Sequence, residues 1–231
     1  MDVGKDLIYL EWDSSFFNKR IAKLAHRYGS VQSIDMSMFD LVQAKVAATD
    51  YKQMNFLTRS GFVLAESEVD FGKTIIDVDN MVFNDINLAT ENDLPQIESI
   101  SRCSFLYSRF REPWYSEEEK NELYEVWATK AFWGEFDDVC LVERLDDQVA
   151  GFITVKVVEK NARVGLLAVA NKFQGKGVGK KLVALAEDFS SKKCAQKLFI
   201  ATQMSNSSAM NLYALLGYRI DSTSYWLYKG Q

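Results

Sequence analysis

Three alternating glycines, Gly175, Gly177 and Gly179, lie between an apolar run that ends at Ala170 and another that begins at Leu182. The segment reads NKFQGKGVGKKL, and the runs on either side are typical of a strand and of a helix. Glycines at such a junction let the backbone approach a ligand, and the helix N-terminus favours an anion there. The sequence therefore predicts a strand, an anion-binding turn and a helix, which places the chain in the α/β class.

Two common glycine-rich motifs do not fit this turn. A P-loop reads GxxxxGK followed by Ser or Thr, whereas here the spacing is one residue short and Lys181 replaces the hydroxyl residue that would bind magnesium. A dinucleotide fingerprint reads GxGxxG with an acidic residue ending the next strand, and the strand KLFIATQ has none. A purely structural turn with solvated lysines is the remaining alternative.

The composition narrows the class of protein. The formal net charge of −5 argues against a nucleic-acid partner, which requires a basic surface. The three cysteines are widely spaced and His26 is the only histidine, so we expect reduced thiols and no metal site. The N-terminal residues lack the apolar region of a signal peptide, and no run approaches the roughly 18 apolar residues of a membrane span. We therefore expect a cytoplasmic protein without a membrane partner.

Two segments of the chain, 42–71 and 198–228, resemble one another. Each has an apolar run, a polar loop, a short helix that contains Met-Asn, then a glycine followed by an aromatic residue and an alternating strand. Gly61 matches Gly217 in this comparison, and both suit the residue that follows a helix. Either the unit is duplicated, or both copies are ordinary helix-glycine-strand units. We place a domain boundary between them, giving domains 1–78 and 79–231.

The second half reads as alternating strands and helices. A strand at 86–89 is followed by a helix entered through Thr90 or Asp93 near Pro95, and then by a hairpin at 136–158 with an Asp-Asp turn. A strand at 162–170, the glycine turn and a helix at 180–193 come next. With the last strand-helix-strand unit, the predicted order is β-α-β-β-β-α-β-α-β in a mixed sheet.

The glycine turn also matches the pattern Q/R-x-x-G-x-G/A through Gln174, Gly177 and Gly179. This pattern resembles the acyl-CoA loop of the GNAT N-acyltransferases. The segments RVGLLAVA, NSSAMNLYALLGY and LATENDLPQI resemble the fourth strand, a late helix and the first strand and helix of that family. The resemblance covers about residues 86–228. It implies a GNAT fold with a mixed, partly splayed central sheet, preceded by a smaller, degenerate GNAT-like N-terminal α/β domain.

The resemblance also implies a cofactor and a reaction. Acyl-CoA would be the co-substrate, and its acyl group would pass directly to an amine without a covalent enzyme intermediate. Tyr213 stands where the family has its general acid, although it also fits a packing role, and Asn206 also fits a helix N-cap. Backbone groups of Leu167 and Val169 would stabilise the oxyanion. The remaining cofactor-binding residues would be Gln174, Gly175, Lys176, Gly177, Val178, Gly179, Lys180 and Asn211.

The segment YSRFREPWY is the candidate for the region that binds the acceptor. Arg109, Arg111, Trp114 and Tyr115 suit an anion with a flat ring, although a helix end with solvated arginines would look the same. LEWDSSFF, VQAKVAATD, SRFREPWY and STSYWLY resemble a narrower group, the bacterial acyltransferases of dTDP-linked amino-deoxysugars. This resemblance implies a nucleotide-sugar acceptor, acetyl or 3-hydroxybutyryl as the acyl group, and a role in surface polysaccharide synthesis. We also expect a homodimer.

The general base is the least defined part of the site. Glu68 and Asp70 lie on a strand that could face the cleft, His26 is the only histidine, and a water molecule could carry the proton instead. In the first repeat Leu57 matches Tyr213 and no glycine turn precedes it, so that half would lack the catalytic parts. A peptide N-acetyltransferase, an antibiotic-modifying acetyltransferase and a CoA-binding module without activity are the alternatives.

Overall fold

The computed structural model describes residues 7–25, 38–75, 84 and 87–230. The N-terminal half contains β1 (Leu7–Tyr9), α1 (Glu11–Phe17), β2 (Ile21–Leu24), β3 (Leu41–Ala47), α2 (Tyr51–Arg59) and β4 (Val63–Thr74). The second half contains α3 (Leu94–Ser104), α4 (Glu117–Phe132), β5 (Val139–Leu145), β6 (Gln148–Val158), β7 (Asn161–Val169), the 3-10 turn η4 (Asn171–Phe173), α5 (Val178–Lys192), β8 (Lys197–Gln203), α6 (Ser207–Leu215) and β9 (Arg219–Gly230).

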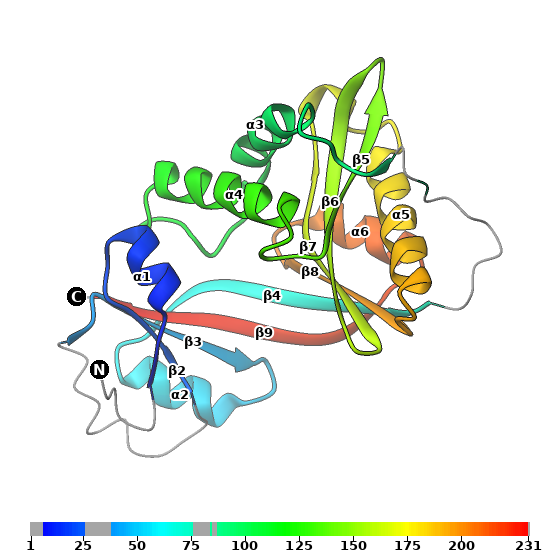
Figure 1. The fold of residues 1–231 in the computed structure, drawn as a ribbon. Coiled ribbons are helices and arrows are strands. Elements are labelled where there is room, and N and C mark those ends of the chain that lie inside the picture. The colour runs from blue at the N-terminus through cyan, green and yellow to red at the C-terminus, as the bar shows by residue number, and fades with distance from the viewer. Residues whose placement is uncertain (1–6, 26–37, 76–83, 85–86, 231) are drawn as a thin grey trace.

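All of these strands join one mixed sheet of nine strands in the order β1-β2-β3-β9-β4-β8-β7-β6-β5. Only the pairs β2–β3 and β7–β8 are parallel. Buried residues of α1, α3 and α4 form one core with the sheet, α5 and α6 form a second, and α2 forms a third with β1–β3. The long strands β4 and β9 run beside one another across the middle of the molecule and connect these cores (Figure 1).

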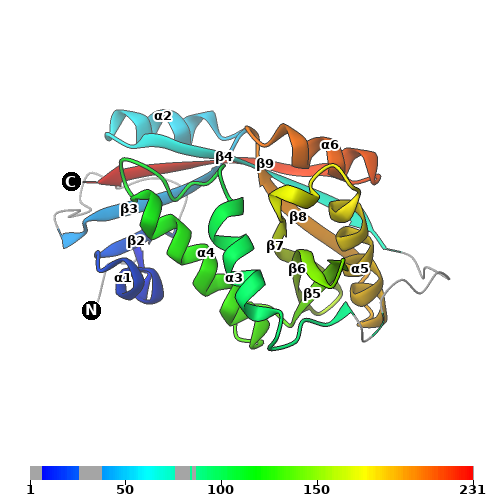
Figure 2. The same cartoon turned by 90° about the horizontal axis from the view of Figure 1, so that it is seen from above.

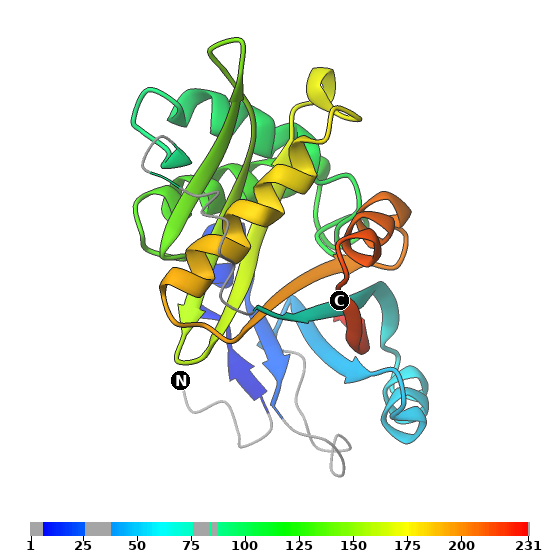
Figure 3. The same cartoon turned by 90° about the vertical axis from the view of Figure 1, so that its right-hand side faces the viewer.

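The two similar segments form the same β-α-β unit. In the first unit β3, α2 and β4 have 7, 9 and 12 residues, and β8, α6 and β9 in the second have the same lengths. Asp50 and Asn206 cap the two helices with nearly equal φ and ψ, and each side chain accepts a backbone N–H. Gly61 and Gly217 follow the helices at φ of 86° and 83°. Both helices lie on the same side of β4 and β9 (Figures 2 and 3).

The two units exchange their last strands. β4 lies between β8 and β9, and β9 lies between β3 and β4, so each unit pairs its first strand with the last strand of the other. Register shifts occur in the β4–β9 pair beside Ala65 and beside Asp221, which are matching positions of the two units. Residues 1–78 and 79–231 therefore share one sheet. The boundary predicted at residue 78 lies outside the described residues.

The second half follows the predicted order with two differences. The hairpin β5–β6 turns at Asp146 and Asp147, whose φ values are 53° and 56°, and α3 begins after Asp93 with Pro95 in its first turn. Of the strand predicted at 86–89, the described residues 87–89 form one isolated bridge, between Leu88 and Leu141. The prediction also missed α4, although Ser116 begins a complete capping box that marks its start. No helix within the described ranges is long and apolar enough to cross a membrane.

Candidate active site

The gap between β7 and β8 forms the centre of the site. These strands are parallel neighbours, but their pairing covers only residues 161–163 of β7 and 197–199 of β8. Beyond Arg163 and Phe199 the two strands diverge, as the predicted splayed sheet requires. The divergence leaves backbone groups of both strands free of the sheet ladder.

Backbone donors of β7 face this gap. The N–H of Leu166 donates to Thr154 Oγ1 at 2.8 Å, and the N–H of Ala170 donates to the Ala150 carbonyl at 3.0 Å, so both point toward β6. Successive N–H groups along a strand alternate between its two edges. The N–H groups of Leu167 and Val169 therefore point away from β6 and toward β8, where an oxyanion would need them.

The glycine turn ends in the N-terminus of α5. Gly175 and Gly177 have φ of 74° and 81°, and Gly177 is the N-cap of the helix. A Cβ at either position would meet no atom within 4 Å, so the positive φ and not crowding requires glycine there. No acceptor among the described residues binds the backbone N–H groups of residues 175–180. A helix N-terminus with this many unpaired donors fits an anion such as a pyrophosphate.

The side chains of the turn contribute unequally. Gln174 Nε2 donates to the Val169 carbonyl at 3.3 Å and so ties the turn to the end of β7. Lys180 lines the cavity described below. Lys176 is not among the lining residues, and its ammonium lies 5.1 Å from the centroid of the Phe173 ring.

Helix α6 places a tyrosine at the other side of the gap. Tyr213 is only 4% exposed and its ring packs edge-on against Phe71, with centroids 5.6 Å apart. Burial raises the pKa of its hydroxyl, which keeps Tyr213 protonated at neutral pH and makes the hydroxyl a weaker acid than a solvent-exposed tyrosine. Asn206 caps α6 by accepting the Ala209 N–H at 3.2 Å and also lines the cavity. Asn211 is exposed and does not line the cavity.

One cavity of about 1300 Å³ connects these elements. Residues of β7, β8, the glycine turn and α6 line one side, which we call the loop arm: Leu167, Val169, Gln174, Gly175, Gly177, Val178, Gly179, Lys180, Asn206, Leu212 and Tyr213. Residues of β3, β4, β9, α4 and the connections before and after α4 line the other side, which we call the aromatic arm: Lys45, Glu68, Phe105, Tyr107, Arg109, Phe110, Tyr124, Trp127, Asp137 and Trp226. Both arms belong to the same cavity, whose lining also includes residues of β7 and β8.

Arg109 is the cation of the segment YSRFREPWY that reaches the aromatic arm. Its guanidinium lies 4.1 Å from the ring centroids of both Phe110 and Trp226. Its Nη1 donates to Gln43 Oε1 at 2.9 Å and to the Tyr228 hydroxyl at 2.5 Å. All four partners are uncharged, so Arg109 is held in place without being neutralised.

The other three residues predicted for the acceptor lie outside the cavity lining. Arg111 donates from Nε and Nη2 to the Ala65 carbonyl, at 3.1 and 2.7 Å. Tyr115 is 1% exposed and its hydroxyl accepts a 2.8 Å hydrogen bond from Gln43 Nε2. Trp114 is half-buried and packs edge-on against a ring of β9. Their contacts attach the segment to the N-terminal half and to the last strand.

A buried carboxylate that the sequence analysis missed lies beneath β7. Asp137 is 5% exposed and accepts a 2.6 Å hydrogen bond from the Thr154 hydroxyl. The strand bulges here, because Gly165 and Leu166 together face Thr154 of β6. A Cβ at Gly165 would lie 2.1 Å from Asp137 Oδ2, so the carboxylate occupies the space that a side chain would need. Burial raises the pKa of Asp137, against the opposing effect of the Thr154 hydrogen bond.

The three residues that the sequence suggested as the general base are Glu68, Asp70 and His26. Glu68 lines the aromatic arm, but its oxygens contact Lys45 Nζ at 2.5 Å and Trp226 Nε1 at 2.9 Å. Asp70 does not line the cavity, and its carboxylate lies 3.7 Å from Lys45 Nζ. His26 lies outside the described residues. No group of acidic, cysteine or histidine side chains that could hold a metal ion occurs within the described ranges.

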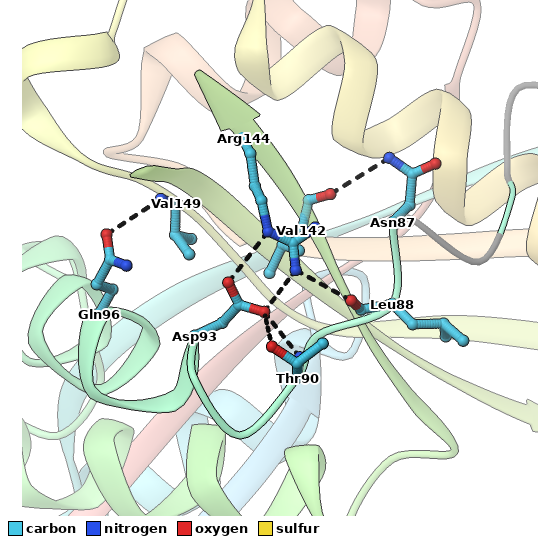
Figure 4. Close-up of polar contacts among 8 residues, drawn as sticks. All are labelled: Asn87, Leu88, Thr90, Asp93, Gln96, Val142, Arg144 and Val149. Atoms are coloured by element: carbon cyan, nitrogen blue, oxygen red, sulfur yellow. Dashed lines mark hydrogen bonds and ion pairs between the residues drawn. The ribbon is translucent and has the colours of Figure 1, made fainter. Parts of the chain in front are cut away.

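A polar network attaches the start of α3 to the hairpin formed by β5 and β6 (Figure 4). Asp93 accepts hydrogen bonds from the backbone and hydroxyl of Thr90, both at 2.7 Å, and from Arg144 Nε and Nη2 at 3.1 and 2.5 Å. Gln96 Oε1 also accepts the Val149 N–H at 3.1 Å. Burial would raise the pKa of Asp93, but the bonds from Arg144 and Thr90 outweigh it and the pKa is lowered. The network anchors the start of α3 to strands β5 and β6.

Comparison with known proteins agrees with this geometry. Residues 101–218 match the model of the acetyltransferase (GNAT) family. The chain is 31% identical over 233 residues to dTDP-fucosamine acetyltransferase of Escherichia coli O6:H1, covering 99% of this chain and 100% of that protein. It is 25% identical over 135 residues to spore coat polysaccharide biosynthesis protein SpsD of Bacillus subtilis, covering 58% of this chain and 46% of that protein.

The fold is shared with solved structures of low sequence identity. A conserved protein of unknown function from Staphylococcus epidermidis superposes with a TM-score of 0.66 at 13% identity, over 97% of this chain and 90% of that one. The splayed strands, the glycine turn at the start of α5 and the family match confirm the GNAT fold with a mixed sheet and the family predicted from the sequence, whereas the separate degenerate N-terminal domain stays a prediction. The chain belongs to the GNAT acetyltransferase family.

Proposed function

We propose that this protein transfers an acyl group, acetyl or 3-hydroxybutyryl, from acyl-CoA to the amino group of a dTDP-linked amino-deoxysugar. The observation that supports this most strongly is the single cavity of about 1300 Å³, which connects the unpaired donors of the glycine turn to the uncompensated Arg109. The similarity to dTDP-fucosamine acetyltransferase also includes the N-terminal half, which contributes Lys45 and Glu68 to the same cavity.

The loop arm binds the acyl donor. The N–H groups of residues 175–180 hold the pyrophosphate at the positive end of α5, and Lys180 adds charge at the rim. The acyl end lies in the gap between the diverging strands. There the N–H groups of Leu167 and Val169 stabilise the negative charge that develops on the thioester oxygen.

Tyr213 and Asp137 move the protons. The amine nitrogen forms a bond to the thioester carbon while the carbon–sulfur bond breaks, and the sulfur leaves as a thiolate. Tyr213, whose pKa is raised by burial, gives its proton to that sulfur. Asp137 accepts the proton that the amine loses, because burial makes its carboxylate more basic than usual while Glu68 is held by Lys45 and Trp226. The products are an amide and free CoA.

The test is release of free CoA thiol from a matrix of donors and acceptors. Acetyl-CoA and 3-hydroxybutyryl-CoA are each combined with a panel of dTDP-amino-deoxysugars, with basic peptides and with aminoglycosides. Rapid release with one dTDP-sugar and one thioester, and slow release with the other amines, is the expected result. Release only with peptides would identify a peptide N-acetyltransferase. Binding of CoA without release for any amine would identify a binding module and refute the proposed reaction.

A further inference from the structure

Three cationic side chains lie near the indole ring of Trp226, which lines the aromatic arm; Arg109 and Lys45 also line the cavity, whereas Lys23 lies outside the lining. The Arg109 guanidinium carbon lies 4.1 Å from the ring centroid, the Lys23 ammonium 5.3 Å and the Lys45 ammonium 5.8 Å. Arg109 belongs to the α3–α4 connection, whereas Lys23 and Lys45 belong to β2 and β3 of the N-terminal half. Segments distant in the sequence thus bring positive charge to one aromatic surface.

These cations are not equally neutralised. Lys45 has a carboxylate partner, since Glu68 Oε1 lies 2.5 Å from its ammonium. Within the described residues, neither Arg109 nor Lys23 has a carboxylate oxygen within 4.0 Å. Asp13 interacts electrostatically with both of them without a direct contact, and burial raises the pKa of its own carboxyl against their lowering effect. The half-buried cations therefore lack a direct counter-charge.

Lys23 shows the effect of this arrangement. Burial lowers the pKa of its ammonium, and repulsion from Arg109 and Lys45 lowers it further, against smaller attractions from Glu68 and Asp13. Desolvated cations that repel one another are unfavourable unless an anion joins them. The energetic cost of placing these cations together is a reason to expect a ligand with negative charge.

The hydrogen-bond pattern of Arg109 indicates the shape of that ligand. Its Nη1 is occupied by Gln43 and Tyr228, but no acceptor among the described residues binds its Nε or Nη2. Arg111 differs, because its Nε and Nη2 both donate to the Ala65 carbonyl. The free edge of Arg109 can donate two parallel hydrogen bonds, the geometry that matches a phosphate group.

We infer that Arg109 and Lys23, arranged around Trp226, bind the diphosphate of a nucleotide-linked acceptor. Arg109 donates two hydrogen bonds to one phosphate, and Lys23 neutralises charge from the side of β2. The N-terminal half is then part of the substrate site and not only a support for the sheet. This inference rests on the proposed function for the identity of the acceptor, but the anion site itself follows from the contacts around Trp226.

The test is calorimetric binding of dTDP, thymidine and inorganic pyrophosphate to the full chain. Arg109→Lys keeps the charge and removes the paired donors, and Lys23→Gln removes the second charge. Lys52→Gln is the matched control, because Lys52 is an exposed cation on α2 of the same half. We expect each of the first two changes to weaken dTDP binding by about tenfold or more, and the control to leave it unchanged. Thymidine binding and acyl-CoA binding, the latter also reporting on folding, should not change in any variant.

The possible results separate the two proposals. Unchanged dTDP affinity in both Arg109→Lys and Lys23→Gln would overturn the diphosphate site, even if the enzyme acylates a dTDP-sugar. Loss of pyrophosphate binding in these variants, with no wild-type affinity for dTDP beyond that for pyrophosphate, would support the anion site and refute the nucleotide-sugar acceptor. If the Arg109→Lys variant does not bind acyl-CoA, it has not folded correctly. The dTDP affinity of the Lys23→Gln variant then decides alone whether the diphosphate site exists.

Discussion

The Thr154 hydroxyl donates a 2.6 Å hydrogen bond to Asp137 and accepts a 2.8 Å hydrogen bond from the Leu166 N–H. One hydroxyl therefore connects a buried carboxylate to the bulge of β7, next to the N–H groups that face the gap. The position of the proposed proton acceptor and the position of the proposed oxyanion donors depend on the same side chain.

Gly165→Ala should destabilise the protein by about 3 kcal/mol, because its Cβ would overlap Asp137 Oδ2 and lie 2.7 Å from Thr154 Oγ1. Urea unfolding measures the loss. Adding Asp137→Gly should recover part of it, since the clash disappears. Gly230→Ala is the control, because the nearest atom to its Cβ would be 3.5 Å away. Equal losses for Gly165→Ala and Gly230→Ala would contradict the crowding described here.

Asp137→Asn should lower kcat/KM by about a hundredfold or more, because the amide cannot accept the amine proton. The wild-type rate should rise with pH as Asp137 ionises, and this limb should be absent in the variant. The Glu68→Gln variant should keep this rise of the rate with pH. The free energy of unfolding should change in the opposite direction to the rate. Because the pKa of Asp137 is raised in the folded state, the wild type should lose stability as the pH rises from the usual 3.8 through the folded-state pKa. The Asp137→Asn variant should not show this loss. A variant profile that kept the limb would exclude Asp137 as the base.

Tyr213→Phe should reduce kcat by about a hundredfold while acyl-CoA affinity stays the same, because only the donor hydroxyl is lost. The ring contacts with Phe71 and Tyr218 remain, so thermal unfolding should change little. Tyr218→Phe is the matched control, since Tyr218 is also buried but does not line the cavity. Stopped-flow or steady-state thiol release distinguishes the two, and equal turnover in wild type and Tyr213→Phe would exclude the acid role.

Gly177→Ala should weaken acyl-CoA binding by about tenfold, as the Cβ strains the positive φ at the N-cap of α5. Space is not the reason, because no atom lies within 4 Å of that Cβ. Lys176→Gln should have a smaller effect, since its ammonium lies over Phe173 and outside the cavity lining. Isothermal titration with CoA measures both, and the reverse order of effects would argue against backbone binding of the pyrophosphate.

Asp93→Asn should lower the free energy of unfolding by about 2 kcal/mol at neutral pH, because Arg144 loses a charged acceptor. The folded-state pKa of Asp93 is lowered, so its stabilisation is present above the usual value of 3.8 and is lost as pH falls through the folded-state pKa. Chemical unfolding at neutral and strongly acidic pH should therefore show a difference that shrinks with acid. A difference independent of pH would contradict the ionised pair.

The parts of the fold that the sequence predicted are those set by local backbone chemistry. Gly175 and Gly177 marked the turn before α5, and Gly61 and Gly217 marked the ends of two matching helices, because a positive φ can be recognised from one residue. The hairpin turn at Asp146 and Asp147 was predicted because two polar residues separate two apolar strands. Helix α4 was not predicted despite the capping box that begins at Ser116, since its hydrophobic pattern is weak and the aromatic segment before it has the composition of a binding loop.

The parts that were not predicted depend on contacts between distant segments. Nothing near Asp137 in the sequence indicates that β6 and β7 bring Thr154 and Gly165 to it. Arg109 and Arg111 are equivalent in the sequence, and only the fold gives one a free edge and the other the Ala65 carbonyl. The exchange of last strands could not be predicted either. Each β-α-β unit is continuous in the sequence, but its first and last strands do not pair with each other in the sheet.

That exchange also restricts how the chain can fold. β3 pairs on one side with β9, and β8 needs β4 from the N-terminal half. N-terminal domains usually fold while the rest of the chain is still being made. Here β3 keeps an open strand edge until β9 is available, so the first half cannot complete its part of the sheet alone. The cavity is therefore complete only once strands from both halves have paired.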